Sequence, residues 1–274
     1  MTGLQSPQLR VDALADALVA ARRSGRALPM APWFDCLADA EAAYGVQDRV
    51  AQALGWFPSG VAGYWKSGGP SRGAALTHAG LPPQGVHSAA DGAVVDLRTA
   101  RLHQPGIELE VALRTARAVS PADVAGWIAR GTMPAAMALV DAMTVAIEVV
   151  DLRWQQPLPE AAPEQVALLK LADQQAHGAL VLGPWQPFVP RDWAHQCCEL
   201  RIGAGATERF EGTHPLRDPA WLLPQWLAHV TRHGRTVPAG TVVTTGTWNG
   251  VHAVQAGDRV DAEMAGMGRI SLRF

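Results

Sequence analysis

Two glutamates separated by a single residue, Glu108 and Glu110, stand out in the segment 106–113. Positions 107, 109, 111 and 113 are all apolar, and this strict alternation predicts a β-strand with one buried face. Both carboxylates then project from the opposite face, with Cα atoms roughly 6.6 Å apart. Carboxylates this close repel each other unless water or a cation lies between them. The pair taken alone is typical of the solvated polar face of an edge strand, and the alternative is a site for a hard divalent cation, Mg²⁺ or Mn²⁺.

A third glutamate, Glu148, lies in the segment 143–151, an almost continuous apolar run rich in β-branched residues. Such a run predicts a strand buried on both faces. A carboxylate in an apolar row needs a partner, because an unpaired buried charge is costly. Arg114 or Arg153 would serve as an ion-pair partner. The other interpretation, a metal, is favoured because three glutamates on two strands, without His or Cys spacing nearby, suit an octahedral oxygen site.

Composition excludes several classes of function. The chain has 274 residues, of which 48% are hydrophobic and 18% charged, and its formal net charge is −2. It can bury a sizeable core, and it lacks the basic excess that nucleic-acid binding requires. No apolar stretch approaches the ~20 residues of a membrane span, and residues 1–7 do not have the pattern of a signal peptide. The three cysteines fit neither a disulfide framework nor a zinc site. From these observations together we expect a cytoplasmic protein with no nucleic-acid or membrane partner.

Helical patterns dominate the start of the chain and strand patterns its end. Helical spacing of apolar residues predicts helices over about 7–25 and 38–54, followed by a loop-rich stretch over 55–92. Further helices are expected over 121–128, 163–175 and 219–233, and further strands over 94–97, 179–182, 199–202, 207–211, 240–245, 259–264 and 268–274. This order predicts the α+β class, with a helical N-terminal segment (1–60) and a strand-rich, metal-binding catalytic domain (61–274).

Several motifs together carry a family resemblance. They are the Glu108-x-Glu110 pair, the segment around Glu148, Ala172-Asp173 before Gly178, and the closing segments 240–247, 254–260 and 267–270. With these motifs the chain resembles the fumarylacetoacetate hydrolase superfamily, and within it the 2-keto-4-pentenoate hydratases and 4-oxalocrotonate decarboxylases. Their helical N-terminal segment and Gly-x-Lys loop correspond to residues 9–54 and Trp65-Lys66. The resemblance implies a mixed β-sheet body of the fumarylacetoacetate hydrolase C-terminal type.

The resemblance also implies a metal centre. Glu108, Glu110 and Glu148 would hold Mg²⁺ or Mn²⁺, and a 2-oxo acid would chelate the cation through its carboxylate and keto oxygens. The cation would then act as a Lewis acid that stabilises an enolate.

Three further residues receive roles from the resemblance. Lys66 would shuttle a proton or stabilise the developing oxyanion, and its alternative is a solvated loop lysine. Thr247 would offer its hydroxyl and backbone N–H groups to the substrate carboxylate, and its alternative is a plain strand-ending turn. Trp65, beside the lysine, is the other expected substrate contact.

Two positions depart from the hydratase pattern. Gln84 stands where the hydratases carry an acidic residue, and Ala176 stands where they carry a serine. His177, next to the missing serine, is a candidate acid/base that would compensate for it. The alternative is a histidine at a helix end, which the helix dipole favours there. The resemblance therefore implies an intact metal site with altered proton-handling residues.

The leading functional prediction is a metal-dependent hydratase of a 2-hydroxypenta-2,4-dienoate-like 2-oxo acid from aromatic catabolism. The nearest alternatives are decarboxylation of an oxalocrotonate-type 2-oxo-hexenedioate and C–C hydrolysis of an acylpyruvate. A different class of function, suggested by the two departures, is a catalytically silent homologue that stabilises a partner enzyme of the same pathway. A sensor without turnover has no supporting feature in the sequence, and we also expect a homo-oligomer.

Overall fold

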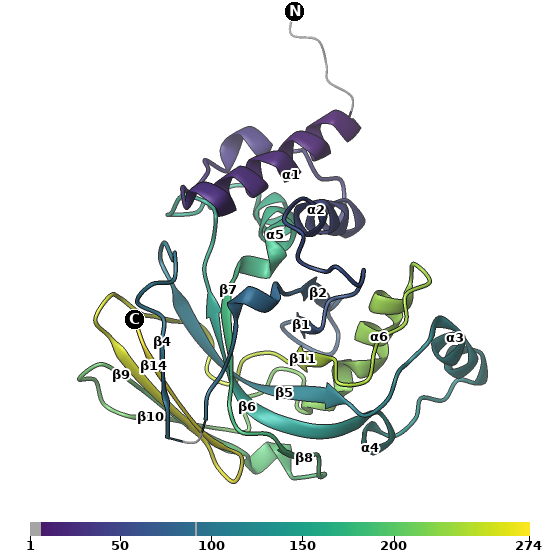
Figure 1. Cartoon of the computed structure of the whole chain (residues 1–274), viewed down its shortest axis with the longest axis vertical. Coiled ribbons are helices and arrows are strands. Elements are labelled where there is room, and N and C mark those ends of the chain that lie inside the picture. Colours follow the sequence, from purple (N-terminus) through teal and green to yellow (C-terminus); the bar gives the residue numbers. More distant parts are fainter. Residues whose placement is uncertain (1–6, 91) are drawn as a thin grey trace, which may run out of the picture.

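Two curled β-sheets packed face to face carry a layer of helices in this α+β protein (Figure 1). The computed structural model describes residues 7–90 and 92–274. Residues 1–6 lie outside the described residues. They belong to the predicted N-terminal segment and to the region tested for a signal peptide. The predicted fold class is confirmed. Among the described helices, none is both long and apolar enough to cross a membrane.

The larger sheet has nine strands, with the central order β2-β1-β11-β5-β6-β7-β3, while β12 pairs with β5 and β8 pairs with β6. Its strands are β1 (Tyr64–Gly68), β2 (Thr77–Gly80), β3 (Val86–Ser88), β5 (Gly106–Thr115), β6 (Val140–Val150), β7 (His177–Leu182), β8 (Gln186–Pro187), β11 (Val242–Thr244) and β12 (His252–Ala253). The smaller sheet has the order β10-β9-β13-β14-β4. Its strands are β4 (Val94–Asp96), β9 (Cys197–Ile202), β10 (Glu208–Glu211), β13 (Arg259–Met264) and β14 (Gly268–Arg273).

The helices flank the larger sheet. They are α1 (Pro7–Ser24), α2 (Ala40–Ala53), α3 (Pro121–Arg130), α4 (Ala136–Leu139), α5 (Pro163–Ala172) and α6 (Leu223–Thr231). Capping side chains fix two of the starts: the carboxylate of Asp39 accepts a hydrogen bond at the start of α2, and Ser120 and Asp123 form a capping box on α3.

The long antiparallel pair of β5 and β6 separates the apolar core from the carboxylates. Ile107, Leu109 and Val111 point between the two sheets into the main core, as the alternation predicted. The other face of the pair carries the three glutamates, and in the register Glu108 lies directly opposite Glu148. Because β5 lies between β11 and β6, the edge-strand interpretation is wrong.

The N-terminal helices do not form an isolated unit. Helices α1 and α2 share one buried cluster with α5 and with Trp154, which is 1% exposed. Residues more than 100 positions apart therefore build one helical layer over the end of the larger sheet (Figure 1). The division of the chain at residue 60 stays a prediction.

The expectation of loops over 55–92 was partly wrong, because β1, β2 and β3 lie within this stretch. These strands are only three to five residues long. Strand β1 pairs with β2 and with β11, and β3 pairs with β7. Both β7 and β11 follow much later in the chain. A periodicity analysis cannot detect such short strands, since their stability comes from partners distant in sequence.

Candidate metal centre

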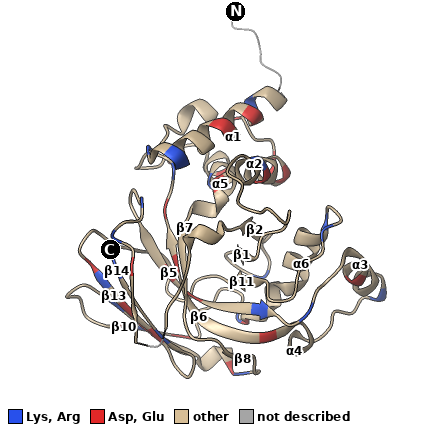
Figure 2. Cartoon of the chain, viewed as in Figure 1, with Lys and Arg blue, Asp and Glu red and all other residues tan. Residues whose placement is uncertain are grey.

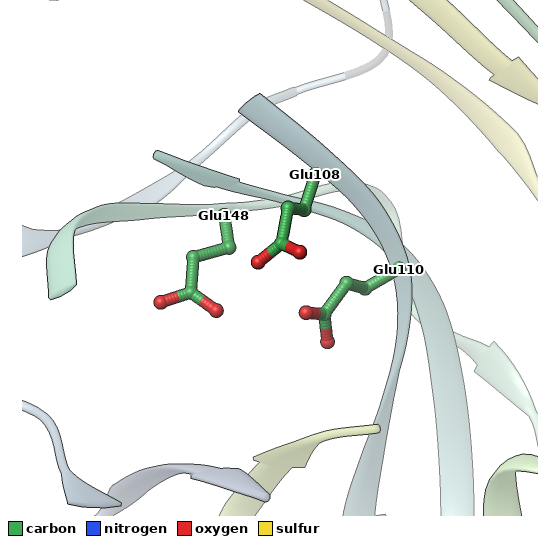
Figure 3. Close-up of side chains that lie close together, drawn as sticks. All are labelled: Glu108, Glu110 and Glu148. Carbon is green, nitrogen blue, oxygen red and sulfur yellow. The ribbon is translucent and has the colours of Figure 1, made fainter. Parts of the chain in front are cut away.

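The three glutamates converge from two strands onto one point (Figure 3). Glu108 and Glu110 come from β5 and Glu148 from β6, and one carboxylate oxygen of each lies within 4.8 Å of the other two. Ala146 lies opposite Glu110 in the register and leaves room for the longer side chains around it. Like charges directly across a strand pair are destabilising, so this cluster needs a compensating cation.

The donor set fits a hard divalent cation. Glu110 and Glu148 are buried, and Glu148 Oε2 has no hydrogen-bond partner among the described residues. A buried carboxylate oxygen without a partner is costly, and a cation would satisfy it. Three carboxylates without a nearby sulfur ligand suit the oxygen preference of Mg²⁺ or Mn²⁺.

Burial and mutual repulsion set the protonation of the cluster. Burial, together with the charges of Glu148 and Glu108, raises the pKa of Glu110 to about 8. Burial also raises the pKa of Glu108. For Glu148 burial acts in the same direction, but the Lys66 charge and hydrogen bonds from His177 and Lys66 outweigh it and lower the pKa of that carboxyl. Glu148 is therefore the ionised member, and a bound cation would favour ionisation of the other two.

Lys66 is the ion-pair partner of Glu148. Its Nζ donates to Glu148 Oε1 at 2.6 Å and to the backbone carbonyl of Gln175 at 3.0 Å. The proposed arginine partners of Glu148 were wrong: Arg114 pairs with Asp141, and Arg153 pairs with Asp173. Burial alone would lower the pKa of Lys66, but the charges of Glu148 and Glu108 outweigh it and raise that pKa, so the ammonium is retained.

The solvated loop lysine is also wrong as an interpretation of Lys66. The residue lies on β1, which pairs in parallel with β11, and its side chain is 12% exposed. Alternate side chains of β1 point to opposite faces, and Trp65 therefore points away from the glutamates. The Trp65 indole donates to the Ala62 carbonyl at 2.9 Å and packs against His229. The structure does not bring Trp65 to the metal centre.

His177 is the first residue of β7 and not a helix-end residue, which corrects that alternative. The α5 helix ends at Ala172, earlier than expected, and a tight turn separates it from the histidine. The ring is buried, with Nδ1 3.4 Å from Glu148 Oε1, and Nε2 has no partner among the described residues. Burial lowers the pKa of His177, so the imidazole is neutral beside the ionised glutamate.

The turn after β11 closes the other side of the cluster. The Gly246 backbone N–H donates to Glu110 Oε2 at 2.9 Å, and the φ of Gly246 is 104°, which favours glycine there. Asn249 Oδ1 accepts from the Leu109 N–H at 2.7 Å, which ties the turn to β5. The Thr247 hydroxyl lies 3.0 Å from Asn249 Oδ1 and 3.1 Å from the Gly250 carbonyl oxygen.

A cavity of about 810 Å³ opens in front of these groups. Its lining includes Lys66, Glu108, Glu110, Gln175 and Thr247. The apolar part of its wall comes from Phe210, Pro215 and Trp248. Glu148, His177 and Trp65 are not among the described residues that line it. The cavity therefore joins carboxylates, a buried ammonium and a polar turn, which is the donor set of a metal-dependent enzyme site.

The comparisons with known proteins agree with this geometry. Residues 82–274 match the family described as fumarylacetoacetate (FAA) hydrolase C-terminal. The chain belongs to the fumarylacetoacetate hydrolase family. The 2-keto-4-pentenoate hydratase 1 of Dechloromonas aromatica (strain RCB) is 30% identical over 278 residues, which cover 97% of each chain. The expected resemblance is thus confirmed.

Solved structures show the same fold. The 4-oxalocrotonate decarboxylase from Pseudomonas putida G7, complexed with magnesium and adipate, has a TM-score of 0.76 and 20% identity, covering 97% of this chain and 98% of that one. The fumarylpyruvate hydrolase from Pseudomonas aeruginosa, in complex with Mn²⁺ and pyruvate, has a TM-score of 0.53 and 17% identity, covering 77% and 88%. The chain is therefore a fumarylacetoacetate hydrolase family member, and the two solved structures that share its fold contain Mg²⁺ or Mn²⁺.

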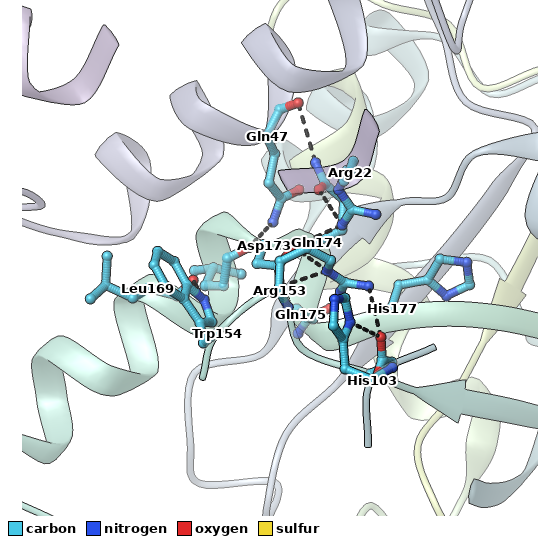
Figure 4. A network of polar contacts seen from close by, with 12 residues as sticks. Arg22, Gln47, His103, Arg153, Trp154, Leu169, Asp173, Gln174, Gln175 and His177 are labelled. Carbon is cyan, nitrogen blue, oxygen red and sulfur yellow. Dashed lines mark hydrogen bonds and ion pairs between the residues drawn. The ribbon is translucent and has the colours of Figure 1, made fainter. Parts of the chain in front are cut away.

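A buried aspartate, Asp173, binds two arginines next to the turn that leads into β7 (Figure 4). The Asp173 carboxylate accepts hydrogen bonds at 2.9 Å from Arg22 Nη2 and from both Nε and the backbone N–H of Arg153. Arg22 belongs to α1, so the aspartate joins the helical layer to the segment that enters β7. Sequence motifs included Asp173 only as part of the resemblance and gave no sign of its two arginine partners.

The turn after Asp173 is held in a strained conformation. Gln174, Gln175 and Ala176 have φ values of 47°, 53° and 63°, a left-handed region that non-glycine residues rarely adopt. The Gln174 amide donates to the Gln47 carbonyl of α2 at 3.3 Å, which helps to hold the turn. This conformation directs the Gln175 carbonyl toward Lys66. The helical layer thus contributes to the position of the lysine in the cavity.

Neither departure from the hydratase pattern is among the described residues that line this cavity. Gln84 is exposed on a 3₁₀ turn, and Ala176 lies in the strained turn before β7. Two polar cavity residues, Gln175 and Asn249, were missed from the sequence. The Asn249-Gly250 pair is a turn signal that could have identified the second of them.

Proposed function

We propose that this chain is a divalent-metal-dependent lyase that hydrates a 2-hydroxypenta-2,4-dienoate-like 2-oxo acid. The observation that carries the proposal is the convergence of Glu108, Glu110 and Glu148 within 4.8 Å, beside a cavity that Glu108, Glu110 and Lys66 line. The 30% identical hydratase relative supports the choice of reaction.

The three carboxylates would hold Mg²⁺ or Mn²⁺, the cations whose ligand preference matches them. The cation supplies a Lewis acid that polarises the 2-oxo group of the substrate. Glu148 orients Lys66, since the same carboxylate accepts the lysine's strongest hydrogen bond. Glu148 would thus both bind the cation and position the lysine.

Lys66 acts as a cation and proton donor in this proposal. In the metal-free protein the glutamate charges raise the pKa of Lys66, and the proposal therefore gives it the role of a proton donor and not that of the initial base. A buried ammonium next to the cavity stabilises negative charge that develops on the substrate oxygen. In a later step the same Nζ would donate a proton to the carbon chain of the substrate.

The substrate carboxylate would be oriented by the turn that contains Thr247. The amide nitrogen of Asn249, Nδ2, has no partner among the described residues, so it is a free donor in this turn. The Thr247 hydroxyl has its own contacts within the turn, and it therefore fixes the position of Asn249 as well as offering a polar contact.

The same residues would also serve decarboxylation of a 2-oxo-hexenedioate or hydrolysis of an acylpyruvate, as the names of the structural neighbours suggest. Product analysis distinguishes these reactions: a hydroxylated keto acid, carbon dioxide, or two cleaved acids. The silent homologue that stabilises a partner enzyme is the alternative without turnover. A homo-oligomer, a partner enzyme of the same pathway and a cytoplasmic location stay predictions.

The test is the loss of dienol absorbance with freshly prepared 2-hydroxypenta-2,4-dienoate and related acids, with and without Mg²⁺ or Mn²⁺. We expect metal-dependent turnover that Glu108→Ala abolishes and that Glu160→Ala, at an exposed position, leaves unchanged. Absence of turnover across the panel with metal present would overturn the proposal and favour the silent homologue.

A further inference from the structure

Lysine is scarce in this chain, and its placement is not random. Lys66 and Lys170 are the only lysines in the sequence, and the other 21 basic residues are arginines. The arginines are scattered over helices and both sheets (Figure 2). Both lysines line the cavity in front of the glutamates, and among the described residues no arginine does.

The two lysines differ in their contacts. Lys66 is buried and paired with Glu148. Lys170 lies in the last turn of α5 and is exposed, and within residues 7–90 and 92–274 it has neither an ion pair nor a hydrogen bond. Burial raises the pKa of the Glu108 carboxyl, and the charges of Lys66 and Lys170 oppose that rise, so Lys170 acts electrostatically on the metal centre.

A second cavity, of about 760 Å³, adjoins the first at Lys170. Its lining includes Leu102, Val150, Leu152 and Val251, which are apolar. Lys170 is the one described residue that lines both cavities, so its ammonium lies where the tail of a substrate anchored at the glutamates would emerge.

We propose that Lys170 is a specificity-determining residue that binds a second, distal carboxylate, so that the chain prefers dicarboxylic 2-oxo acids. This inference rests on the proposed metal-dependent chemistry at the 2-oxo acid head, and it replaces the monocarboxylic pentadienoate by acids that carry a distal carboxylate. A distal carboxylate would be repelled by the glutamates, and the unpaired ammonium offsets this repulsion. Its flexible stem suits tails of different length, whereas an arginine would fix one geometry.

Two structural roles compete with this proposal. A cation in the last helical turn stabilises the helix dipole of α5, and a cation near Glu108 compensates the carboxylate cluster. Neither role depends on the tail of a bound acid, so ligands that differ only in the tail separate them from the proposal.

The experiment compares two saturated six-carbon acids, 2-oxoadipate and 2-oxohexanoate, by calorimetric titration of the Mg²⁺-loaded protein. They share the 2-oxo acid head and differ in the distal carboxylate. We expect 2-oxoadipate to bind more tightly by about three- to tenfold, the size of one charge-assisted contact at a partly exposed site. Lys170→Gln should remove this ratio and Lys170→Arg should keep most of it.

Arg98→Gln is the matched control, since Arg98 lines the second cavity but is already paired with Asp96 at 2.5 Å. It should leave the ratio unchanged. Equal binding of both acids by the wild type, or a ratio that survives in Lys170→Gln, would overturn the inference. An equal loss of affinity for both acids, or for Mg²⁺ alone, would show a structural role and overturn it too. Failure of both acids to bind the metal-loaded protein would instead count against the proposed function.

A second measurement does not depend on variants that might perturb folding. With two lysines, of which one is buried, acylation by N-hydroxysuccinimide acetate followed by peptide mass spectrometry reports directly on Lys170. We expect 2-oxoadipate with Mg²⁺ to slow acylation of Lys170, and 2-oxohexanoate with Mg²⁺ to leave it unchanged. Equal protection by both acids would contradict the assignment.

Discussion

The Nζ atom of Lys66 lies 2.6 Å from Oε1 of Glu148, and the two residues are 82 positions apart in the chain. The glutamate is buried and the lysine nearly so. Each group shifts the protonation of the other toward the charged form, so the ion pair persists at neutral pH. This contact links the metal-binding face of β6 to β1.

Lys66→Met should leave the Glu148 carboxylate buried without its cation. Breaking a buried ion pair typically costs about 3–5 kcal/mol, so the metal-free variant should lose about that much free energy of unfolding. Loss of the ammonium next to the substrate should lower kcat by about 100-fold or more. Urea unfolding and initial rates measure the two effects.

Lys170→Met is the control for Lys66→Met, because Lys170 lines the same cavity without an ion pair among the described residues. It should change the free energy of unfolding by less than about 1 kcal/mol. Comparable destabilisation by both substitutions would contradict the energetic role assigned to the Lys66–Glu148 pair.

Metal should stabilise the protein through the three glutamates. Saturation with Mg²⁺ or Mn²⁺ at about 100 times Kd should add about 2.7 kcal/mol to the free energy of unfolding, and chelation should remove it. Glu110→Gln should greatly weaken this effect, since it removes a buried ligand, whereas Glu160→Gln should retain it. Thermal unfolding with and without metal is the measurement. Undiminished stabilisation of Glu110→Gln would place the cation elsewhere.

The sequence was sufficient for the parts of the site that depend on local pattern. Strict alternation over 106–113 identified which face of β5 carries the carboxylates, because side chains on a strand repeat every two residues. The apolar run around Glu148 gave the second strand, because a continuous run of β-branched residues is typical of a strand buried on both faces. The choice between a metal and an ion-pair partner required tertiary contacts.

The parts that failed depend on pairing between distant segments. Lys66 was expected in a loop, since a five-residue strand has too few positions to show a period, and only its pairing with β11 defines it. His177 was placed at a helix end because the left-handed turn at 174–176 contains no glycine that would have indicated a turn there. Trp65 was grouped with Lys66 by adjacency, although neighbours on a strand point to opposite faces.

His177→Asn should have a modest effect on turnover. The imidazole is neutral, buried and outside the described cavity lining, so we expect it to orient Glu148 and not to transfer protons to the substrate. Asparagine can still donate a hydrogen bond to the Glu148 carboxylate, and kcat should therefore fall by less than about tenfold. The pH profile of kcat should keep its shape. A loss of about 100-fold or more together with a lost limb of the profile would make His177 the acid/base instead.

Acid should destabilise the protein through two histidines between α2, α6 and β2. The rings of His78 and His229 lie 4.4 Å apart, and Tyr44 packs on His229 at 4.3 Å. Burial, with a smaller effect of the Arg232 charge, lowers the pKa of His78 to about 3. Burial, with smaller effects of the His78 and Arg232 charges, lowers the pKa of His229 to about 2. In the unfolded chain both titrate near the ordinary value of about 6.5.

The sign follows from proton uptake. Below about pH 6.5 the two histidines bind protons in the unfolded chain but not in the folded protein. Their contribution to the free energy of unfolding is therefore complete above that pH and falls as the pH drops toward 3, by at most about 1.4 kcal/mol per histidine per pH unit. His229→Phe keeps a ring in the cluster and removes one titrating group, so the slope of unfolding free energy between pH 6 and 5 should become shallower. His195→Asn is the control: His195 is exposed, and hydrogen bonding to Asp192 raises its pKa, so its removal should not make that slope shallower. Urea unfolding at pH 7, 6 and 5 measures the slopes, and an unchanged slope in His229→Phe would mean that His229 is protonated in the folded protein.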